Sequence, residues 1–295
     1  MKNIIYSIPL AFVIISCSNQ TSGEVESKKE LPLTLIYLSS RGDGFDLYQK
    51  KIGDSTETKI TSNPGWDWNA QAINGEGIVH NSTDTLDGFS MRKIEANGNS
   101  ASLYLGGLPE VTIAPDGDQV VYARKNGDNN YLMLSKLSSL KDSILISDEE
   151  SYNGRAKWSA KSNKIAYISD RTGSNEIFVY SVNGKSTLQL TSNGYREKYL
   201  SWGPDGEFIA TTMQTDSTEN DIYQISILTK TVDQLTNTPE IHESEISWSP
   251  NGQFIAYHAK VNTKDDIYLL NIETKEVKKV TNGEGYHGEP VFILP

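Results

Sequence analysis

The stretch Glu243–Thr281, ESEISWSPNGQFIAYHAKVNTKDDIYLLNIETKEVKKVT, has the pattern of four short strands joined by turns. The turn after the first strand is SPNG, in which proline pre-sets φ and Asn-Gly tolerates positive φ. The flanking runs carry β-branched and aromatic residues, which favour a half-buried pleated sheet. The four strands are predicted, with the polar loop Lys260–Asp266 between the second and third, at Ser244–Trp248, Gln253–Ala259, Ile267–Ile272 and Val277–Thr281.

This unit recurs along the chain with a spacing of 42 to 46 residues, and three landmarks keep step. The position of Trp248 recurs as Gln71, Ile113, Trp158, Trp202 and Phe292. The end of the "IAY" strand falls at Tyr37, His80, Tyr122, Tyr167, Thr211 and Tyr257, and the end of the fourth strand at Thr61, Ser147, Thr191, Thr236 and Thr281. We expect the tryptophans at the first landmark to pack between neighbouring units.

A period near 44 residues with four short strands per copy is typical of a β-propeller blade. The turns Ala114–Gly117, Gly203–Gly206 and Ser249–Gly252, together with the "IAY" and "DIY" strands, resemble the TolB-type propeller repeat. The same repeat occurs in the propellers of prolyl-oligopeptidase and dipeptidyl-peptidase enzymes. The resemblance implies an all-β fold, and it specifies fold more than function.

The ends of the repeat array predict how the ring closes. The first copy begins at Leu33 and lacks a leading strand, whereas Tyr286–Leu294 is a leading strand without the other three. Pairing them completes one blade and removes the open edge of a linear array. The sequence therefore predicts a monomeric six-bladed propeller of four-stranded antiparallel blades, closed by its N- and C-terminal strands, in one domain over residues 32–295.

Residues 1–17, MKNIIYSIPLAFVIISC, combine a lysine, a short apolar run and a small residue before Cys17. This is typical of a secretory signal rather than a membrane span. Because Cys17 is the single cysteine and follows Ile14-Ile15-Ser16, the segment resembles a bacterial lipobox, and an ordinary signal peptide is the alternative. The resemblance implies an exported lipoprotein anchored through Cys17, facing the periplasm or the cell surface, with residues 18–31 as a flexible tether. Which membrane holds the anchor stays open.

The formal net charge is −11. An acidic chain repels phosphate backbones and anionic lipid headgroups, so nucleic acid is not an expected partner and the lipid anchor is the expected contact with the membrane. The same charge also serves solubility.

Motifs for catalysis are largely missing from the sequence. It contains no G-x-S-x-G, H-E-x-x-H, EF-hand or Gly-rich phosphate-loop motif. This separates the chain from the propeller peptidases, and no cofactor is expected. The triplet Arg41-Gly42-Asp43 lies in a predicted loop, whose turn chemistry explains it.

Aromatic, histidine and charged residues gather in the segments that lead into the first strand of each blade. In propellers these segments crowd one end of the central channel, where large amphipathic side chains form binding surfaces. Capping of the neighbouring blade is the alternative role for each residue. The candidate binding face is Trp66, Trp68, Tyr152, Arg155, Tyr195, Arg196, Tyr199, His242, Glu245, Tyr286, His287 and Glu289.

Two interpretations of this face remain. The TolB resemblance implies an envelope protein or peptide partner and a non-catalytic scaffold, although residues 18–31 are too short for the separate N-terminal domain of TolB, which puts a Tol role in doubt. Alternatively, His242 and His287, with Glu245 and Glu289, are candidates for a metal site at the channel mouth. That site would indicate a carbohydrate-active or other small-molecule enzyme that resembles oligogalacturonate lyase.

Overall fold

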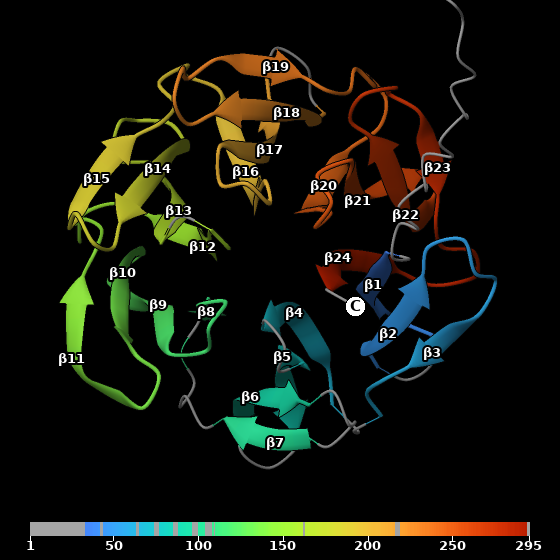
Figure 1. The fold of residues 1–295 in the computed structure, drawn as a ribbon, viewed down its shortest axis with the longest axis horizontal. Helices are drawn as coiled ribbons and strands as arrows, with labels where there is room; N and C mark the ends of the chain where they lie inside the picture. The colour runs from blue at the N-terminus through green and yellow to red at the C-terminus, as the bar shows by residue number, and fades with distance from the viewer. Residues whose placement is uncertain are drawn as a thin grey trace, which may run out of the picture. The chain divides into compact units, whose positions relative to one another are not determined.

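A computed structural model describes residues 33–41, 44–62, 65–73, 77–84, 88–95, 100–103, 108, 110–161, 163–215 and 219–293. Cys17, the tether, Gly42-Asp43 and Leu294 lie outside these residues. Pro32–Pro295 forms one compact unit. Its described residues form six four-stranded sheets set around a central axis (Figure 1). No helix long and apolar enough to cross a membrane occurs among them.

Each sheet is one blade, and its four strands run outward from the axis. The innermost strands are β24 (His287–Ile293), β4 (Asp67–Ile73), β8 (Thr112–Ile113), β12 (Asn153–Trp158), β16 (Arg196–Trp202) and β20 (Glu243–Trp248). The second strands are β1 (Thr34–Ser39), β5 (Gly77–Asp84), β9 (Gln119–Asn126), β13 (Lys164–Ser169), β17 (Phe208–Gln214) and β21 (Phe254–Val261). The third strands are β2 (Asp46–Lys51), β6 (Gly88–Ile94), β10 (Asn129–Lys136), β14 (Glu176–Ser181), β18 (Asp221–Ser226) and β22 (Lys264–Asn271). The outermost strands are β3 (Glu57–Lys59), β7 (Ser100–Leu103), β11 (Ser139–Leu145), β15 (Ser186–Gln189), β19 (Val232–Gln234) and β23 (Val277–Lys279). We number the blades 1 to 6 in this order.

Blade 1 is built from both ends of the repeat array, as predicted. Its strand order is β24-β1-β2-β3, and the red strand β24 lies beside the blue strand β1 in Figure 1. The register pairs Leu35 with Phe292 and Ile36 with Val291. β24 therefore covers the inner edge of β1, which a linear array would expose.

The predicted SPNG-type turns join the first and second strands. The N–H groups of Gly117, Gly206 and Gly252 donate to the carbonyls three residues earlier, at 2.9, 3.0 and 3.0 Å. All three glycines have φ between +75° and +80°, a conformation that favours glycine. The turns predicted from the repeated Pro-Asp/Asn-Gly sequences are therefore confirmed.

Two details of the predicted repeat were wrong. The loop predicted at residues 260–266 is a two-residue hairpin, because Asn262 and Thr263 both have positive φ and join β21 to β22 directly. Positive φ at both central residues matches the strand twist in tight hairpins. In blade 2 the residue equivalent to Trp248 is Ala72 rather than Gln71: Trp248 pairs with Ile255 and Ala72 pairs with Ile78, each two residues before the "IAY" landmark.

The threonine landmark at the end of the fourth strand caps the third strand. In five blades its hydroxyl accepts a hydrogen bond from the backbone N–H fourteen or fifteen residues earlier, at 2.8–2.9 Å. The donors are Leu47, Leu132, Ile177, Ile222 and Ile267, and the acceptors are Thr61, Ser147, Thr191, Thr236 and Thr281. The repeat therefore satisfies a buried donor that the short fourth strand does not reach.

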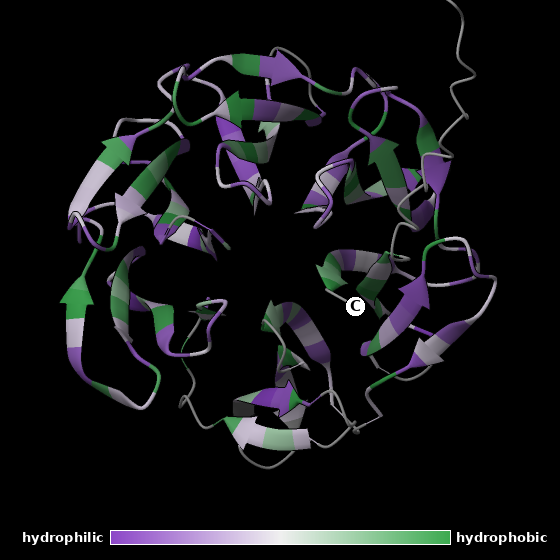
Figure 2. Cartoon of the chain, viewed as in Figure 1, coloured by the Kyte–Doolittle hydropathy of each residue, from purple (hydrophilic) through white to green (hydrophobic). Residues whose placement is uncertain are grey.

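The apolar core lies between blades rather than within them. Buried side chains of the described residues form six clusters, and each combines residues of two neighbouring blades. Figure 2 shows hydrophobic and hydrophilic segments alternating along the strands. Each sheet thus buries both faces against its two neighbours, which no single blade could do alone.

Candidate functional site

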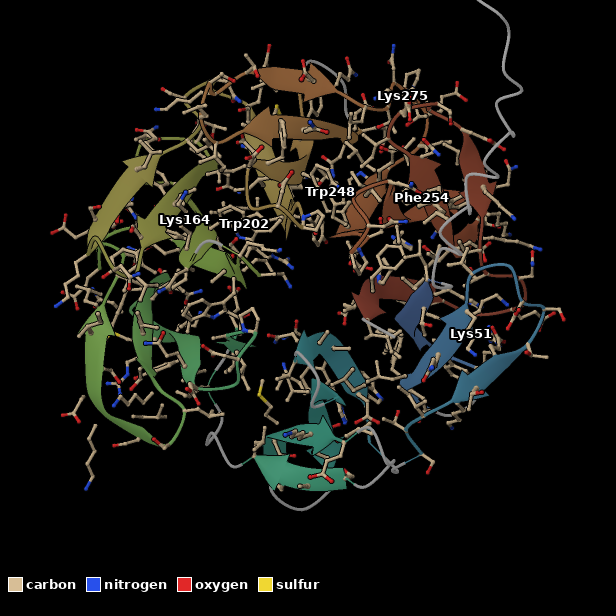
Figure 3. The ribbon with its side chains drawn as sticks, in the orientation of Figure 1. Lys51, Lys164, Trp202, Trp248, Phe254 and Lys275 are labelled. Atoms are coloured by element: carbon tan, nitrogen blue, oxygen red, sulfur yellow. The ribbon has the colours of Figure 1, made fainter. Side chains whose placement is uncertain are left out.

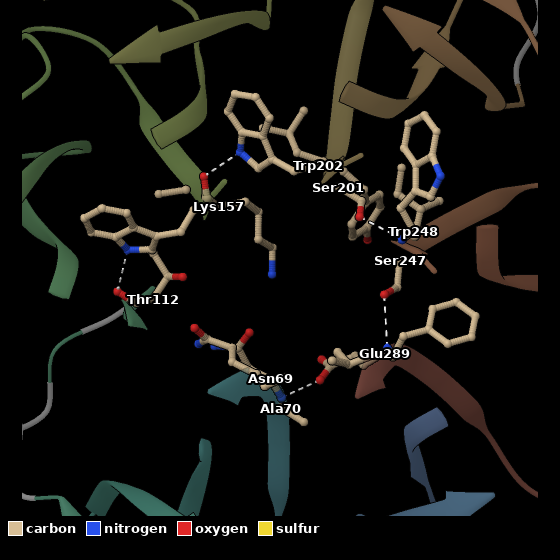
Figure 4. Close-up of a pocket in the computed structure, with 18 of the residues that line it drawn as sticks. Asn69, Ala70, Thr112, Lys157, Ser201, Trp202, Ser247, Trp248 and Glu289 are labelled. Carbon is tan, nitrogen blue, oxygen red and sulfur yellow. Dashed lines mark hydrogen bonds between the residues drawn. The ribbon is translucent and has the colours of Figure 1, made fainter. Parts of the chain in front are cut away.

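A cavity of about 610 Å³ occupies the centre of the ring. It is lined by the innermost strands of all six blades and by the turns that follow them (Figure 4). Because these strands hold equivalent places in the ring, their starting residues gather at one end, here called the polar mouth. Their last residues and the proline-containing turns form the opposite, more apolar end.

The innermost strands carry an extra residue near the polar mouth. The strand register shifts in blades 1, 2, 4, 5 and 6, which marks a β-bulge. At the same repeat position the backbone adopts φ between +47° and +57° in five blades, which is uncommon for residues other than glycine. We call the residues at this position the bulge ring: Asn69, Glu110, Arg155, Tyr199, Glu245 and Glu289, of which Tyr199 alone lacks the positive φ.

Carboxylates of the bulge ring link one blade to the next. Glu245 Oε2 accepts from the N–H of Glu289 at 2.8 Å, and Glu289 Oε2 accepts from the N–H of Asn69 at 2.5 Å. Glu110 Oε2 accepts from the N–H of Arg155 at 2.7 Å. The bulge turns each of these N–H groups out of its own ladder, and the preceding blade supplies the acceptor. The acidic groups of the mouth are therefore part of the ring's own construction.

Two tyrosines hold these carboxylates in place. The Tyr286 hydroxyl donates to Glu245 Oε2 at 2.6 Å, and the Tyr152 hydroxyl donates to Glu110 Oε1 at 3.3 Å. Burial, reinforced by the neighbouring Glu110, raises the pKa of Tyr152 to about 12. Burial and Glu245 likewise raise the pKa of Tyr286. Both phenols consequently remain protonated donors at neutral pH.

Two cations on β12 face the same cavity. The Arg155 guanidinium lies over the Tyr199 ring, 4.8 Å from its centroid. The Lys157 side chain extends into the open middle of the cavity (Figure 4), and its ammonium has no hydrogen bond or ion pair with any residue of the described part of the chain. Burial lowers the pKa of Lys157; the charge of Glu289 opposes this shift and that of Arg155 adds to it.

Trp158, Trp202 and Trp248 form much of the wall toward the apolar end, and Figure 3 shows Trp202 and Trp248 on the inner side of their blades. Trp202 is buried against blade 4, and its Nε1 donates to the Lys157 carbonyl at 2.9 Å. Trp158 and Trp248 are half-buried. The tryptophans therefore pack between blades, as expected, and they also line the cavity, which was not expected.

The structure divides the predicted binding face into three groups. Trp68, Arg155, Tyr199, Glu245 and Glu289 line the cavity. Tyr152 and Tyr286 support the bulge ring from behind. On the outer rim, Trp66 is 56% exposed and stacks edge-on against Phe45, while Tyr195 is 37% exposed and Arg196 is exposed.

The two histidines of the proposed metal site have separate partners. His287 is fully buried, accepts from Arg41 at 3.0 Å and stacks on Tyr37; burial and Arg41 lower its pKa to about 4. His242 lies 3.1 Å from both Glu219 and Asn220. No group of three or more His, Cys, Asp or Glu side chains arranged to hold a metal ion occurs among the described residues.

Sequence reasoning missed three cavity residues, Asn69, Glu110 and Lys157. Asn69 and Glu110 occupy the bulge-ring position, three residues before the Trp248 landmark. Correct alignment of blade 2 on Ala72 would have revealed Asn69, and Glu110 already stood at this offset from Ile113. Lys157 directly precedes the Trp158 landmark, so its place in the repeat could be read from the sequence, but the bulge between Gly154 and Lys157 prevents assignment of its face by counting alternate residues.

Solved structures of other proteins share this six-bladed architecture. A TolB from Acinetobacter baumannii matches with a TM-score of 0.72 and 18% identity, over 88% of this chain and 66% of that one, so the chain spans just under two thirds of its length. A TolB described as putative from Agrobacterium tumefaciens matches with a TM-score of 0.67 and 14% identity, over 87% and 91% of the two chains. An oligogalacturonate lyase in complex with manganese matches with a TM-score of 0.56 and 14% identity, over 84% and 74%.

These identities show a shared fold only. A sequence comparison with curated proteins gives no match. The family model described as PD40, the TolB beta propeller domain, matches residues 141–293, which is just over half of the chain. The chain therefore belongs to the TolB beta-propeller family.

Proposed function

We propose that this protein is an exported, lipid-anchored binding protein of the bacterial cell envelope, without catalytic activity, which holds a segment of a protein partner at the polar mouth. The leader and Cys17 support export and anchoring. The tether of residues 18–31 gives the propeller reach from the membrane surface.

The central cavity carries this proposal. A volume of about 610 Å³, apolar walls and a few polar groups are typical of ligand sites. The acidic groups at its mouth accept backbone N–H groups of the neighbouring blade, an arrangement that favours holding a shape over transferring protons.

The rim supports a macromolecular partner. Trp66 and Tyr195 expose large aromatic surface beside the mouth, and such residues anchor protein interfaces. The net charge of −11 favours partners other than nucleic acid.

Site-specific photo-crosslinking in cells tests the proposal. A photoreactive phenylalanine analogue at Trp66 or Tyr195 should capture a defined envelope protein. The matched control carries the analogue at Leu228, which is 91% exposed in the β18–β19 turn, on the face opposite the polar mouth. Capture of the same proteins from both faces, or of none from the rim, would reject the proposal.

The anchor has its own test. Cys17→Ala should abolish incorporation of radioactive fatty acid and leave the protein as an uncleaved or mislocalised precursor, because it removes the single cysteine that could carry the lipid. Retention of the label in the variant would show that Cys17 is not lipidated.

A further inference from the structure

The Lys157 ammonium is the feature of the cavity that the blade-to-blade contacts leave unexplained. Of the other cations lining the cavity, Arg155 stacks on Tyr199, and Lys161 is exposed in the turn at the apolar end. Lys157 alone among the described residues brings an unpaired positive charge to the middle of the cavity (Figure 4).

This placement is costly in the empty protein. An ammonium removed from bulk water without a hydrogen-bonded counter-charge is disfavoured, and the lowered pKa of Lys157 reflects that burial. The carboxylates whose charges act on Lys157 form no hydrogen bond with it: Glu289 Oε2 accepts the Asn69 N–H, and Glu110 Oε2 accepts the Arg155 N–H. A bound anion would therefore supply the partner that the protein withholds.

The backbone holds Lys157 rigidly. Its carbonyl accepts from the Trp202 indole at 2.9 Å, and it pairs with Ala166 in the β12–β13 ladder. The ammonium itself stays on a flexible four-carbon stem, so the fixed backbone sets the region of the cavity that the charge can reach. A ligand group that enters this region meets the ammonium.

We propose that Lys157 binds the carboxylate of a ligand, and specifically the C-terminal carboxylate of a peptide segment that enters through the polar mouth. This inference deepens the proposed function and rests on it. A peptide end presents one carboxylate with apolar or aromatic side chains behind it, and the cavity presents one ammonium beside Trp158, Trp202 and Trp248.

A sugar acid shares the carboxylate but fits the remaining wall less well. Its hydroxyl groups need several donors and acceptors, because unpaired polar groups are penalised in a buried site. The Glu110, Glu245 and Glu289 carboxylates already accept hydrogen bonds from the protein. The remaining wall combines indole and proline with amides and hydroxyls, and several of these polar groups bond within the ring: Gln71 bonds to Val111 and Ile113, and Ser201 and Ser247 accept the N–H groups of Trp248 and Phe292. The observations thus favour a peptide over a uronate.

Tryptophan fluorescence and calorimetry of the purified protein test this directly, since four of the five tryptophans line the cavity. The probes are N-acetyl-Ala-Ala-Phe with a free carboxylate and the same peptide as its C-terminal amide. We expect the acid to bind at least ten times more tightly than the amide, which lacks the charge-assisted contact. D-galacturonate and D-galactose form the second matched pair.

Lys157→Met should remove the preference for the acid, and Lys157→Arg should keep most of it. The control Lys141→Met, at an exposed lysine on the outermost strand β11 and outside the cavity lining, should leave the preference unchanged. Unchanged melting of Lys157→Met would separate recognition from folding. Equal binding of acid and amide by the wild type, or a preference that survives in Lys157→Met, would overturn the inference. Tighter binding of galacturonate than of the peptide acid would overturn the choice of a peptide.

The two proposals can fail separately. If photo-crosslinking at the rim captures a partner equally in wild type and Lys157→Met, the partner proposal stands and the role of Lys157 falls. If no partner is captured but the acid-to-amide preference depends on Lys157, the carboxylate site stands without the scaffold function.

Discussion

At the position five residues before the Trp248 landmark, at or next to the start of the innermost strand, five blades bury a polar residue completely. These residues are Asp67, Asn153, Glu197, Glu243 and His287, each 0% exposed. Each has a local polar partner: for example, Asn193 Nδ2 donates to Glu197 at 3.0 Å, and the hydroxyls of Thr236 and Thr238 donate to Glu243. The position therefore couples the start of each blade to its loops, at the cost of burying titratable groups.

Glu197 should make stability depend on pH. Burial and the nearby Glu176 raise its pKa to about 7. The folded state thus keeps a proton that the unfolded state releases near pH 4.5, so stability falls as pH rises from about 4.5 through 7. Glu197→Gln mimics the protonated form and should gain about 3 kcal/mol relative to wild type between pH 4.5 and pH 8.

Urea unfolding at several pH values measures this difference. The exposed Glu207→Gln is the matched control and should show no such trend. A pH-independent difference between Glu197→Gln and wild type would mean that Glu197 is ionised in the folded protein throughout this range.

The Thr281 hydroxyl should contribute more to the free energy of unfolding than its size suggests. It accepts the Ile267 N–H at 2.9 Å and donates to Asp266 at 2.9 Å, in a buried setting. Thr281→Ala leaves the Ile267 N–H without an acceptor and should lower the free energy of unfolding by about 1–3 kcal/mol. Thr281→Ser should cost much less, as blade 3 already uses Ser147 at this position. Equal losses in both variants would assign the effect to the methyl group.

At the scale of the strand, the bulge sets the character of the site. One extra residue turns an N–H toward the axis, and the carboxylate of the preceding blade accepts it. The same insertion decides which side chains reach the cavity. Variation at the bulge ring can therefore change the ligand while the blades stay the same.

Trp202 should contribute to stability through packing between β16 and blade 4. Its side chain is 8% exposed in a cluster with Ala166, Ile168 and Val179. Trp202→Ala should cost about 3–5 kcal/mol in thermal or urea unfolding. The control Trp66→Ala removes an exposed indole and should cost well under 1 kcal/mol. If Trp202→Ala melts as wild type, the residue serves the cavity alone.

The sequence predicts the blades well because buried positions recur: Tyr37, Tyr122 and Tyr167 keep step and are all fully buried. It predicts the site less well because a bulge breaks the alternation of faces, so residues beyond it cannot be assigned by counting in twos. Ala72 was misaligned for a related reason, since a small residue replaces tryptophan there and leaves no compositional signal. Lys157 was not predicted as a cavity residue because lysine side chains in folded proteins are usually exposed to solvent.

At the scale of the whole ring, closure depends on one short strand. β24 is the innermost strand of blade 1, and Phe292 belongs to the cluster that joins blades 6 and 1. A chain ending after Gly285 should aggregate or melt far below wild type, because it exposes the edge of β1 and opens this cluster. A chain beginning after residue 31 should melt as wild type. A stable soluble monomer from the first truncation would contradict the closure mechanism.

A disulfide across the seam checks the same feature without deletion. Ile36 and Val291 are paired in the β1–β24 register, and paired residues in antiparallel sheets lie at distances compatible with a disulfide. The double variant Ile36→Cys, Val291→Cys should crosslink within the monomer and raise the melting temperature. Crosslinking solely between molecules would indicate that β24 is exchanged between copies.

The seam also sets the order of events when the protein is made. A ribosome releases β1, β2 and β3 first, and more than two hundred residues follow before β24 emerges. During that time blade 1 lacks the strand that covers its innermost edge, so the earliest part of the propeller is the last to be completed. A polypeptide threaded through a narrow export channel would meet the same delay on the far side. The ring can thus close only when the whole array has arrived, and an interrupted chain would keep an open edge by which quality-control proteases or chaperones could recognise it.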